Sequence, residues 1–187
     1  MNFLQYNHEN LLSEDLLLKQ NLEFSKDIPN FHRLEINHSS GKFNLEEKTY
    51  LAVSTALQLF SGQSTKIDRA KKACANFKVL NQDILGSHTS LNRKQILNML
   101  TQLYLYVFPR ISDFMGLPEK QVSSRGFSLS LKNLFILPEL EDNSQFFENI
   151  SGFTLNVQTK TKSVQEVILL LSGFHIPIYK IKKSQNR

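Results

Sequence analysis

The sequence predicts an α+β fold, in which a mainly antiparallel sheet has helices packed on one face and a long projecting β-hairpin loop. Segments with the two-residue period of strands follow one another as hairpins, whereas segments with helical periodicity occur separately. Hydrophobic residues make up 41% and aromatic residues 10% of the 187-residue chain, which is enough for one core. We therefore expect a helical arm over residues 1–28, a single α+β domain over residues 29–179 and a basic tail over residues 180–187.

In the first third of the chain, residues 9–22 predict a leucine-rich helix, which is broken before Pro29. Residues 33–37 alternate apolar and polar side chains and predict a strand. A second helix is predicted from Asn44, a good N-cap residue, to Gly62, which ends it.

The middle of the chain predicts a hairpin followed by a helix. The segment after Gln63 reads as two strands joined by a long exposed loop centred near residues 76–83. Residues 93–108 then place apolar side chains every three or four positions, which predicts a helix with one buried face. Pro109 stops this helix or kinks its last turn.

The last third alternates strands and helices. Further strands are predicted over residues 127–131, 134–137 and 153–159. The second of these ends at Pro138, and an acidic stretch follows it. Ser163 with Glu166 three residues later is a capping box, which predicts a helix closing at Gly173.

The positive charge of the chain is concentrated between Lys66 and Lys94. This segment has seven basic and two acidic residues, so its net charge of +5 equals that of the whole chain. A polyanion is the expected partner, and a basic loop that serves only solubility is the alternative. The segment also contains Phe77 and three alanines, which suit close packing against RNA. We therefore expect an RNA-binding surface here.

Other functional classes lack their signatures. The single cysteine, Cys74, excludes an internal disulfide and indicates a reducing compartment. No apolar run approaches the roughly 20 residues of a membrane helix, so no membrane partner is expected. The five histidines lack metal-ligand spacing, and there is no phosphate-binding loop or nucleophile elbow. We interpret Glu139, Glu141 and Asp142 as a solvent or protein-interface feature at a strand end. We expect no catalytic residue, no metal and no cofactor.

Four blocks of residues, in order and spacing, carry a resemblance that covers about residues 29–178. They are Ser61-Gly62-Gln63 with Lys71-Lys72 and Asn76-Phe77-Lys78; Phe108-Pro109-Arg110-Ile111 with Asp113-Phe114 and Gly116-Leu117; Arg125-Gly126 with Phe135 and Pro138-Glu139-Leu140; and Gly152-Phe153 through Thr159 with Gly173-Phe174 and Ile176-Pro177. Together they resemble large-subunit ribosomal protein five, the universal family that binds 5S rRNA.

The resemblance implies a structural constituent of the large ribosomal subunit that binds 5S rRNA in the central protuberance and approaches the peptidyl-site tRNA. By position, it implies that Asn37, Gln63 and Ser90 contact 5S rRNA. The basic segment adds Lys66 and Arg69 to this rRNA-binding set, and His88 joins it because it lies beside the RNA-facing strand. It also implies a tRNA-proximal loop that carries Lys71, Lys72, Asn76, Phe77 and Lys78. The implied partners are 5S rRNA, large-subunit rRNA, peptidyl-site tRNA and neighbouring ribosomal proteins of the central protuberance and small-subunit head. For Phe77, stacking on a base and packing at the base of the loop stay equally open.

Several positions depart from the family pattern. The turn His38-Ser39-Ser40-Gly41 has fewer glycines, and Asn92, Ser112 and Met115 stand where the family has basic residues. Asp83 lies near the tip of the projecting loop, where it would face a tRNA phosphate. This loss of basic residues resembles divergent mitochondrial members of the family.

The expected location is therefore the mitochondrial matrix, on a mitochondrial ribosome. Glu9, Glu14 and Asp15 precede the first arginine, Arg33, so the N-terminal region does not resemble an arginine-rich presequence. We accordingly expect an organelle-encoded gene, and a bacterial-type cytoplasmic or plastid ribosome is the less favoured location. A free-standing RNA-binding module and an RNA-acting enzyme outside the ribosome are the alternative functions.

Overall fold

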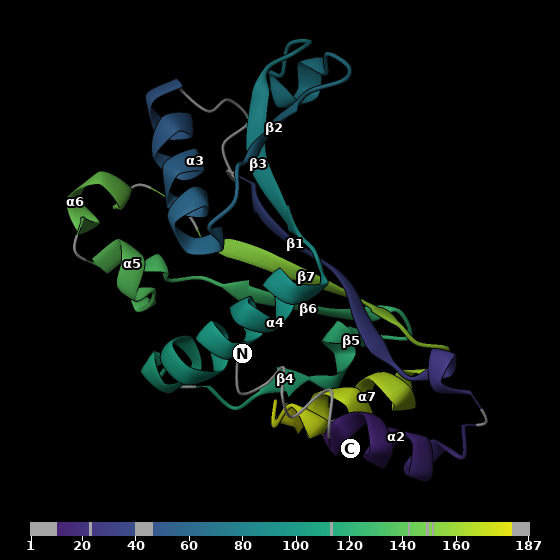
Figure 1. The fold of residues 1–187 in the computed structure, drawn as a ribbon. Coiled ribbons are helices and arrows are strands. Elements are labelled where there is room, and N and C mark those ends of the chain that lie inside the picture. Colours follow the sequence, from purple (N-terminus) through teal and green to yellow (C-terminus); the bar gives the residue numbers. More distant parts are fainter. Residues whose placement is uncertain are drawn as a thin grey trace, which may run out of the picture. The chain divides into compact units, whose positions relative to one another are not determined.

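The computed structural model describes residues 11–22, 24–39, 47–112, 114–141, 143–148, 150 and 152–180. Figure 1 shows the helices and strands of these residues, which divide into two compact units. Unit 1 spans Met1–Arg33, Arg93–Leu129 and Val157–Arg187, and unit 2 spans Leu34–Asn92 and Ser130–Asn156.

Six strands form the main sheet, in the order β2-β3-β1-β7-β6-β5. They are β1 (Asn30–Ser39), β2 (Lys66–Arg69), β3 (Ile84–Leu91), β5 (Val122–Ser123), β6 (Gly126–Leu131) and β7 (Phe153–Lys160). β3 pairs antiparallel with both β1 and β2, and β5 pairs antiparallel with β6. A parallel pair of two-residue strands, β4 (Leu117–Pro118) and β8 (Ile178–Tyr179), forms a second sheet. The predicted α+β fold with a mainly antiparallel sheet is confirmed.

Helices occur in both units. Unit 1 contains α2 (Ser13–Gln20), α4 (Arg93–Gln102) and α7 (Val164–Gly173), and unit 2 contains α3 (Glu47–Ser61), α5 (Pro138–Glu141) and α6 (Ser144–Phe147). α4 continues as a π-helix over Leu103–Val107 and a 3-10 turn over Phe108–Arg110. Other 3-10 turns cover Ser25–Asp27, Ala75–Phe77, Glu119–Gln121 and Leu134–Ile136. The predicted helix start at Asn44 lies outside the described residues. Within the described ranges, no helix is long and apolar enough to cross a bilayer.

The core of unit 2 lies between α3 and the strands β1 and β3. The buried residues of α3, spaced three or four positions apart, form one stripe: Val53, Ala56, Leu57 and Phe60. α3 contacts β3, and the Phe60 ring stacks on Phe153 of β7 with a centroid distance of 6.2 Å. Leu34 and Ile36 of β1 are fully buried. One face of this strand pair therefore belongs to the core.

In unit 1, α7 begins with the predicted capping box. The Ser163 hydroxyl accepts a hydrogen bond from the Glu166 N–H at 3.3 Å, and the Glu166 carboxylate accepts one from the Lys162 N–H at 2.8 Å. The helix buries Val167, Leu170 and Leu171. Phe174, just after the helix, contacts Phe31 with a ring-centroid distance of 5.0 Å.

One predicted strand is wrong. Leu134–Ile136 form a 3-10 turn instead, because the Asn133 side chain accepts a hydrogen bond from the Phe135 N–H at 3.0 Å and curls the backbone. Pro138 is then the first residue of α5, a position where its missing N–H costs nothing. Glu139 consequently lies in the first turn of a short helix and not at a strand end.

Candidate nucleic-acid interface

β2 and β3 form the predicted projecting hairpin, which extends past the N-terminal end of α3 within unit 2 (Figure 1). The segment that joins the two strands is folded. The Ala70 N–H donates to the Asp83 carbonyl at 2.9 Å, and the Gln82 N–H donates to the Ala70 carbonyl at 3.0 Å. These bonds separate residues 71–82, which we call the hairpin tip, from the strands below.

The hairpin tip has its own backbone structure. Cys74 and Val79 form an isolated β-bridge, in which the Cys74 N–H donates to the Val79 carbonyl at 2.9 Å. Between them, Ala75–Phe77 form a 3-10 turn and Lys78 adopts the left-handed region with φ 52°. The direction of the side chains at the tip is therefore set by a closed turn.

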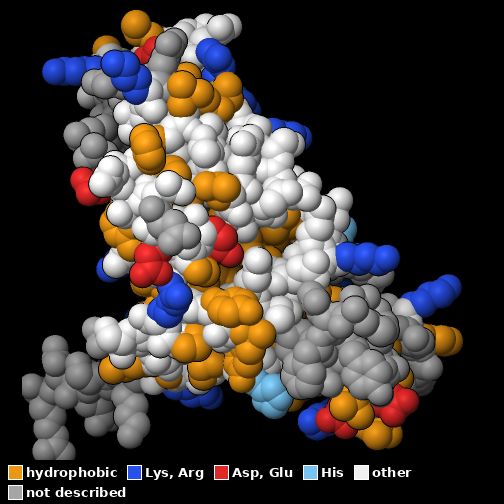
Figure 2. All heavy atoms as spheres, turned by 60° about the vertical axis from the view of Figure 1, so that its left-hand side comes forward, with side chains coloured by type: hydrophobic (Ala, Val, Ile, Leu, Met, Phe, Trp, Pro, Cys, Tyr) orange, Lys and Arg blue, Asp and Glu red, His pale blue; other side chains and the backbone are white. Residues whose placement is uncertain are grey.

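Basic side chains of the hairpin are exposed. The predicted residues of the hairpin that are exposed are Lys66, Arg69, Lys71, Lys72, Asn76, Phe77 and Lys78. Figure 2 shows lysine and arginine side chains beside hydrophobic ones at the top of the view, where the hairpin lies. Phe77 is 54% exposed and lies in the turn at the tip, so its ring is accessible to a base.

Asp83 fixes the turn that closes the hairpin tip. Its carboxylate Oδ2 accepts a hydrogen bond from the Leu80 N–H at 2.7 Å. The sequence predicted that this carboxylate would face a tRNA phosphate. The structure gives the same group a local bond to the backbone, so this carboxylate has a structural role in the turn.

Three predicted residues lie side by side across the strands of the hairpin and β1. Asn37 is directly opposite His88, and His88 is directly opposite Lys66. Residues directly opposite each other in an antiparallel pair share a face, and so do residues two positions apart in one strand. The surface that these rules define, here called the polar face, consists of Glu35, Asn37, Lys66, Asp68, His88 and Ser90.

The opposite face of the same strands belongs to the core. Ser87 and Thr89 alternate with the polar-face residues of β3 and are buried, as are Leu34 and Ile36 of β1. The Thr89 hydroxyl donates to the Ser64 carbonyl at 2.9 Å, which holds the start of β2 against β3. Because α3 packs on this side, the partly exposed side chains of the polar face are the ones that a ligand can reach.

The predicted residues do not form one cluster. Gln63 is exposed in the connection between α3 and β2, where its N–H donates to the Ser61 hydroxyl at 3.2 Å. Arg69 lies beyond a register shift in β2, and its guanidinium donates to the Gln82 carbonyl at 3.3 Å. With a strand rise of about 3.3 Å per residue, the first residue of β3, Ile84, lies roughly 13 Å from His88, and the hairpin tip lies beyond it. The polar face and the hairpin tip are therefore two separate contact regions.

One contact was missed by the sequence reasoning. The His88 ring Nδ1 lies 2.7 Å from Oδ1 of Asp68, so the two side chains form a hydrogen-bonded pair on the polar face. The sequence indicated Asp68 only as an acidic residue within a basic segment. The signal for a common face was its two-residue spacing from Lys66, but the proximity to His88 depends on the pairing of β2 with β3.

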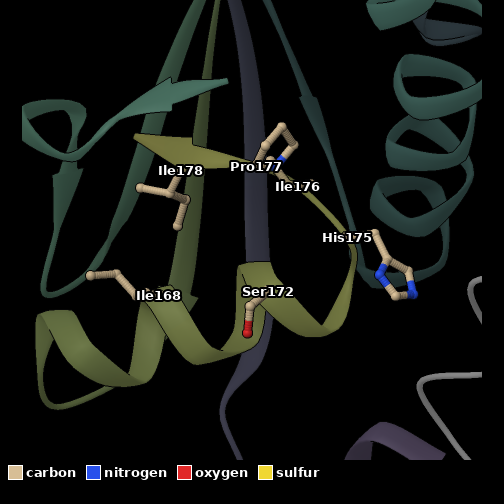
Figure 3. Close-up of a pocket in the computed structure, with 6 residues that line it drawn as sticks. All are labelled: Ile168, Ser172, His175, Ile176, Pro177 and Ile178. Carbon is tan, nitrogen blue, oxygen red and sulfur yellow. The ribbon is translucent and has the colours of Figure 1, made fainter. Parts of the chain in front are cut away.

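Two grooves are lined by residues outside the polar face and the hairpin tip. In unit 1, Ile168 of α7 and Ile178 of β8 border a space of about 390 Å³, with His175 at its far end (Figure 3). In unit 2, a groove of about 510 Å³ lies between α3 and α6, next to Leu51 and Phe146. None of the predicted site residues lines either groove. Over the part of the chain that the structure describes, no three histidine, cysteine or acidic residues gather as a metal site would require.

Comparison with known proteins gives a consistent picture. The family model for the C-terminus of the ribosomal L5 family matches residues 84–178. The chain is 29% identical over 181 residues to large ribosomal subunit protein uL5m of Reclinomonas americana, covering 96% of this chain and 100% of that protein. It is 32% identical over 163 residues to uL5 of Wigglesworthia glossinidia brevipalpis, covering 87% and 90%. It is 27% identical over 175 residues to uL5 of Malacoplasma penetrans, covering 93% and 92%.

The match to the family model begins at the first residue of β3 and ends in β8. The alignments with the relatives extend over nearly the whole chain. The chain therefore belongs to the ribosomal L5 family.

Proposed function

We propose that this chain is a structural constituent of the large subunit of a mitochondrial ribosome. In this proposal the polar face binds 5S rRNA in the central protuberance, and the hairpin tip approaches the peptidyl-site tRNA. The main support for this proposal is that Asn37, His88 and Lys66 form a row across three strands, on the face turned away from α3. The amide of Asn37 and the imidazole of His88 can form hydrogen bonds with ribose and base edges. The ammonium group of Lys66 lies beside them and can contact a phosphate.

Each region has a distinct role in the proposal. The rRNA-binding residues are Asn37, Gln63, Lys66, Arg69, His88 and Ser90. The tRNA-proximal residues are Lys71, Lys72, Asn76, Phe77 and Lys78. Large-subunit rRNA and neighbouring ribosomal proteins of the central protuberance and small-subunit head are further partners, and no residue is assigned a catalytic role.

The mitochondrial location is supported by the similarity to a relative named uL5m. We include in the proposal a location in the mitochondrial matrix and a gene encoded in the organelle. To test the location, mitochondria are isolated and their ribosomal subunits are fractionated. The chain should be detected with the large subunits.

The decisive experiment measures binding of the purified protein to 5S rRNA across a salt series, against an unrelated structured RNA of equal length. We expect at least a tenfold preference for 5S rRNA, since specific contacts add to the charge term that any RNA provides. Asn37→Ala combined with Gln63→Ala should remove most of that preference. The matched control is Gln121→Ala combined with Gln158→Ala, which removes two exposed amides elsewhere. Equal binding of both RNAs by the native chain would overturn the proposal.

Association with the ribosome separates this function from that of a free-standing RNA-binding module. An integral subunit protein should sediment with large subunits at a salt concentration that dissociates proteins held by charge alone. Release of the chain under those conditions, with retention of other subunit proteins, would favour the free-standing module.

A further inference from the structure

The Asp68–His88 pair lies within the polar face, and its position follows from strand register. Asp68 in β2 is directly opposite Gly86 in β3, and the diagonal neighbour of Asp68 on the same face is His88. Because glycine has no side chain, the carboxylate of Asp68 meets no opposing group and reaches the imidazole instead. The distance from Oδ1 to Nδ1 is 2.7 Å.

The chemistry of this pair sets the direction of the proton. An ionised carboxylate only accepts hydrogen bonds, so the Nδ1 of His88 is the donor. In the neutral imidazole one ring nitrogen carries the proton and the other has a free lone pair. With the proton fixed on Nδ1, Nε2 becomes a hydrogen-bond acceptor.

We propose that Asp68 is a positioning residue for RNA binding: it holds His88 in the tautomer whose Nε2 accepts a hydrogen bond from a donor group of RNA. This inference rests on the proposed function. The donor is a ribose 2′-hydroxyl or a base amino or imino group, because phosphate oxygens offer no proton at neutral pH. His88 thus recognises a donor, whereas the neighbouring Lys66 is suited to phosphate.

The arrangement has an electrostatic cost that the test has to separate from positioning. Asp68 introduces a negative charge next to Lys66 on a surface that faces a polyanion. Removal of this negative charge should therefore strengthen non-specific binding to any RNA. Asp68→Asn removes the charge and keeps an oxygen acceptor for Nδ1, whereas Asp68→Ala removes both.

The first test is the imidazole ¹⁵N spectrum of the native protein at pH 8, well above the range in which ordinary imidazoles titrate. We expect the His88 signals of a ring protonated at Nδ1 alone, retained in Asp68→Asn and lost in Asp68→Ala. Protonation at Nε2 in the native protein, or an unchanged spectrum in Asp68→Ala, would overturn the proposal. This readout needs no RNA, so it stands even if 5S rRNA is not the ligand.

The second test compares affinities for 5S rRNA. Asp68→Ala should bind about three- to tenfold more weakly than Asp68→Asn, the effect of one hydrogen bond. This difference should disappear in a His88→Ala background. Single 2′-deoxy substitutions in 5S rRNA distinguish a ribose donor from a base donor. If a 2′-hydroxyl is the donor, one of these substitutions should weaken binding as much as Asp68→Ala does relative to Asp68→Asn, and otherwise none should. Equal affinities of Asp68→Ala and Asp68→Asn, with 5S rRNA preference intact, would overturn the positioning role and leave the proposed function standing.

Discussion

At the scale of single residues, Gly126 is the clearest constraint on the fold. It begins β6 with φ 148°, and a Cβ atom at this position would clash with the carbonyl oxygen of Val157. Both the backbone conformation and the close approach exclude a side chain. We expect Gly126→Ala to lower the free energy of unfolding by about 2 kcal/mol or more, as measured by urea denaturation.

The control for this prediction is Gly62→Ala. Gly62 also has a positive φ, 65°, but among the residues that the structure describes, apart from its chain neighbours, none lies within 4 Å of the position that a Cβ atom would occupy there. Its substitution should cost only about 1 kcal/mol, the conformational part of the effect. Equal losses at the two positions would show that the contact with Val157 is unimportant. The sequence alone does not reveal this constraint, because the carbonyl oxygen that would clash with a side chain belongs to Val157 in β7, which is distant in sequence.

At the scale of elements, the capping box of α7 should carry measurable stability. Ser163 accepts from the Glu166 N–H and fixes the first turn of a helix whose apolar side is buried. Ser163→Ala should lower the free energy of unfolding by about 1 kcal/mol, because an N-terminal N–H of the helix loses its partner. Thermal and urea unfolding both report this change.

Ser172 in the last turn of the same helix provides the comparison. Ser172 is exposed, and its hydroxyl donates to the Leu169 carbonyl. This bond does not supply a partner to an N–H group at the start of the helix. Ser172→Ala should stay within about 0.5 kcal/mol of the native protein. A larger loss at Ser172 than at Ser163 would contradict the capping role.

Elements governed by local signals were the ones that the sequence predicted well. The capping box of α7 needs only four consecutive residues, and Gly62 marks the end of α3 where the sequence placed it. The buried stripe of α3 was predicted only in part, because Leu51 and Leu59 are exposed. The apolar run at 134–137 failed as a strand because Asn133 and Pro138, its two neighbours, favour a turn and a helix start. The hairpin was predicted as two strands and a loop, but the bridge between Cys74 and Val79 inside that loop was not visible in the pattern.

At the scale of the whole molecule, the candidate site depends on pairing between distant strands. Asn37 and His88 are far apart in sequence and become direct neighbours through the register of β1 and β3. The sequence indicated four of the six residues of the polar face, Asn37, Lys66, His88 and Ser90, and their role in binding RNA stays a prediction. The contact of Asp68 with His88 required the structure. The division into an arm, a domain and a tail stays a prediction.

The distribution of charge leads to a last prediction. The segment from Lys66 to Lys94 carries a net charge equal to the +5 of the whole chain, and its lysines at the hairpin tip are exposed. RNA binding should therefore draw its salt dependence mainly from the hairpin. Replacing Lys71, Lys72 and Lys78 together by glutamine should reduce the slope of log affinity for tRNA against log salt by about 2 to 3, since each phosphate contact contributes about 0.7 to 0.9.

The same change of charge elsewhere tests whether position matters. Lys120, Lys132 and Lys160 are exposed and lie outside the basic segment, so their replacement by glutamine alters the net charge identically. This control should leave the slope nearly unchanged if phosphates contact the hairpin tip directly. Both triple variants should unfold at the same temperature as the native protein, because exposed lysines contribute little to stability. Equal slopes for the two variants would mean that the net charge, and not the hairpin tip, attracts the RNA.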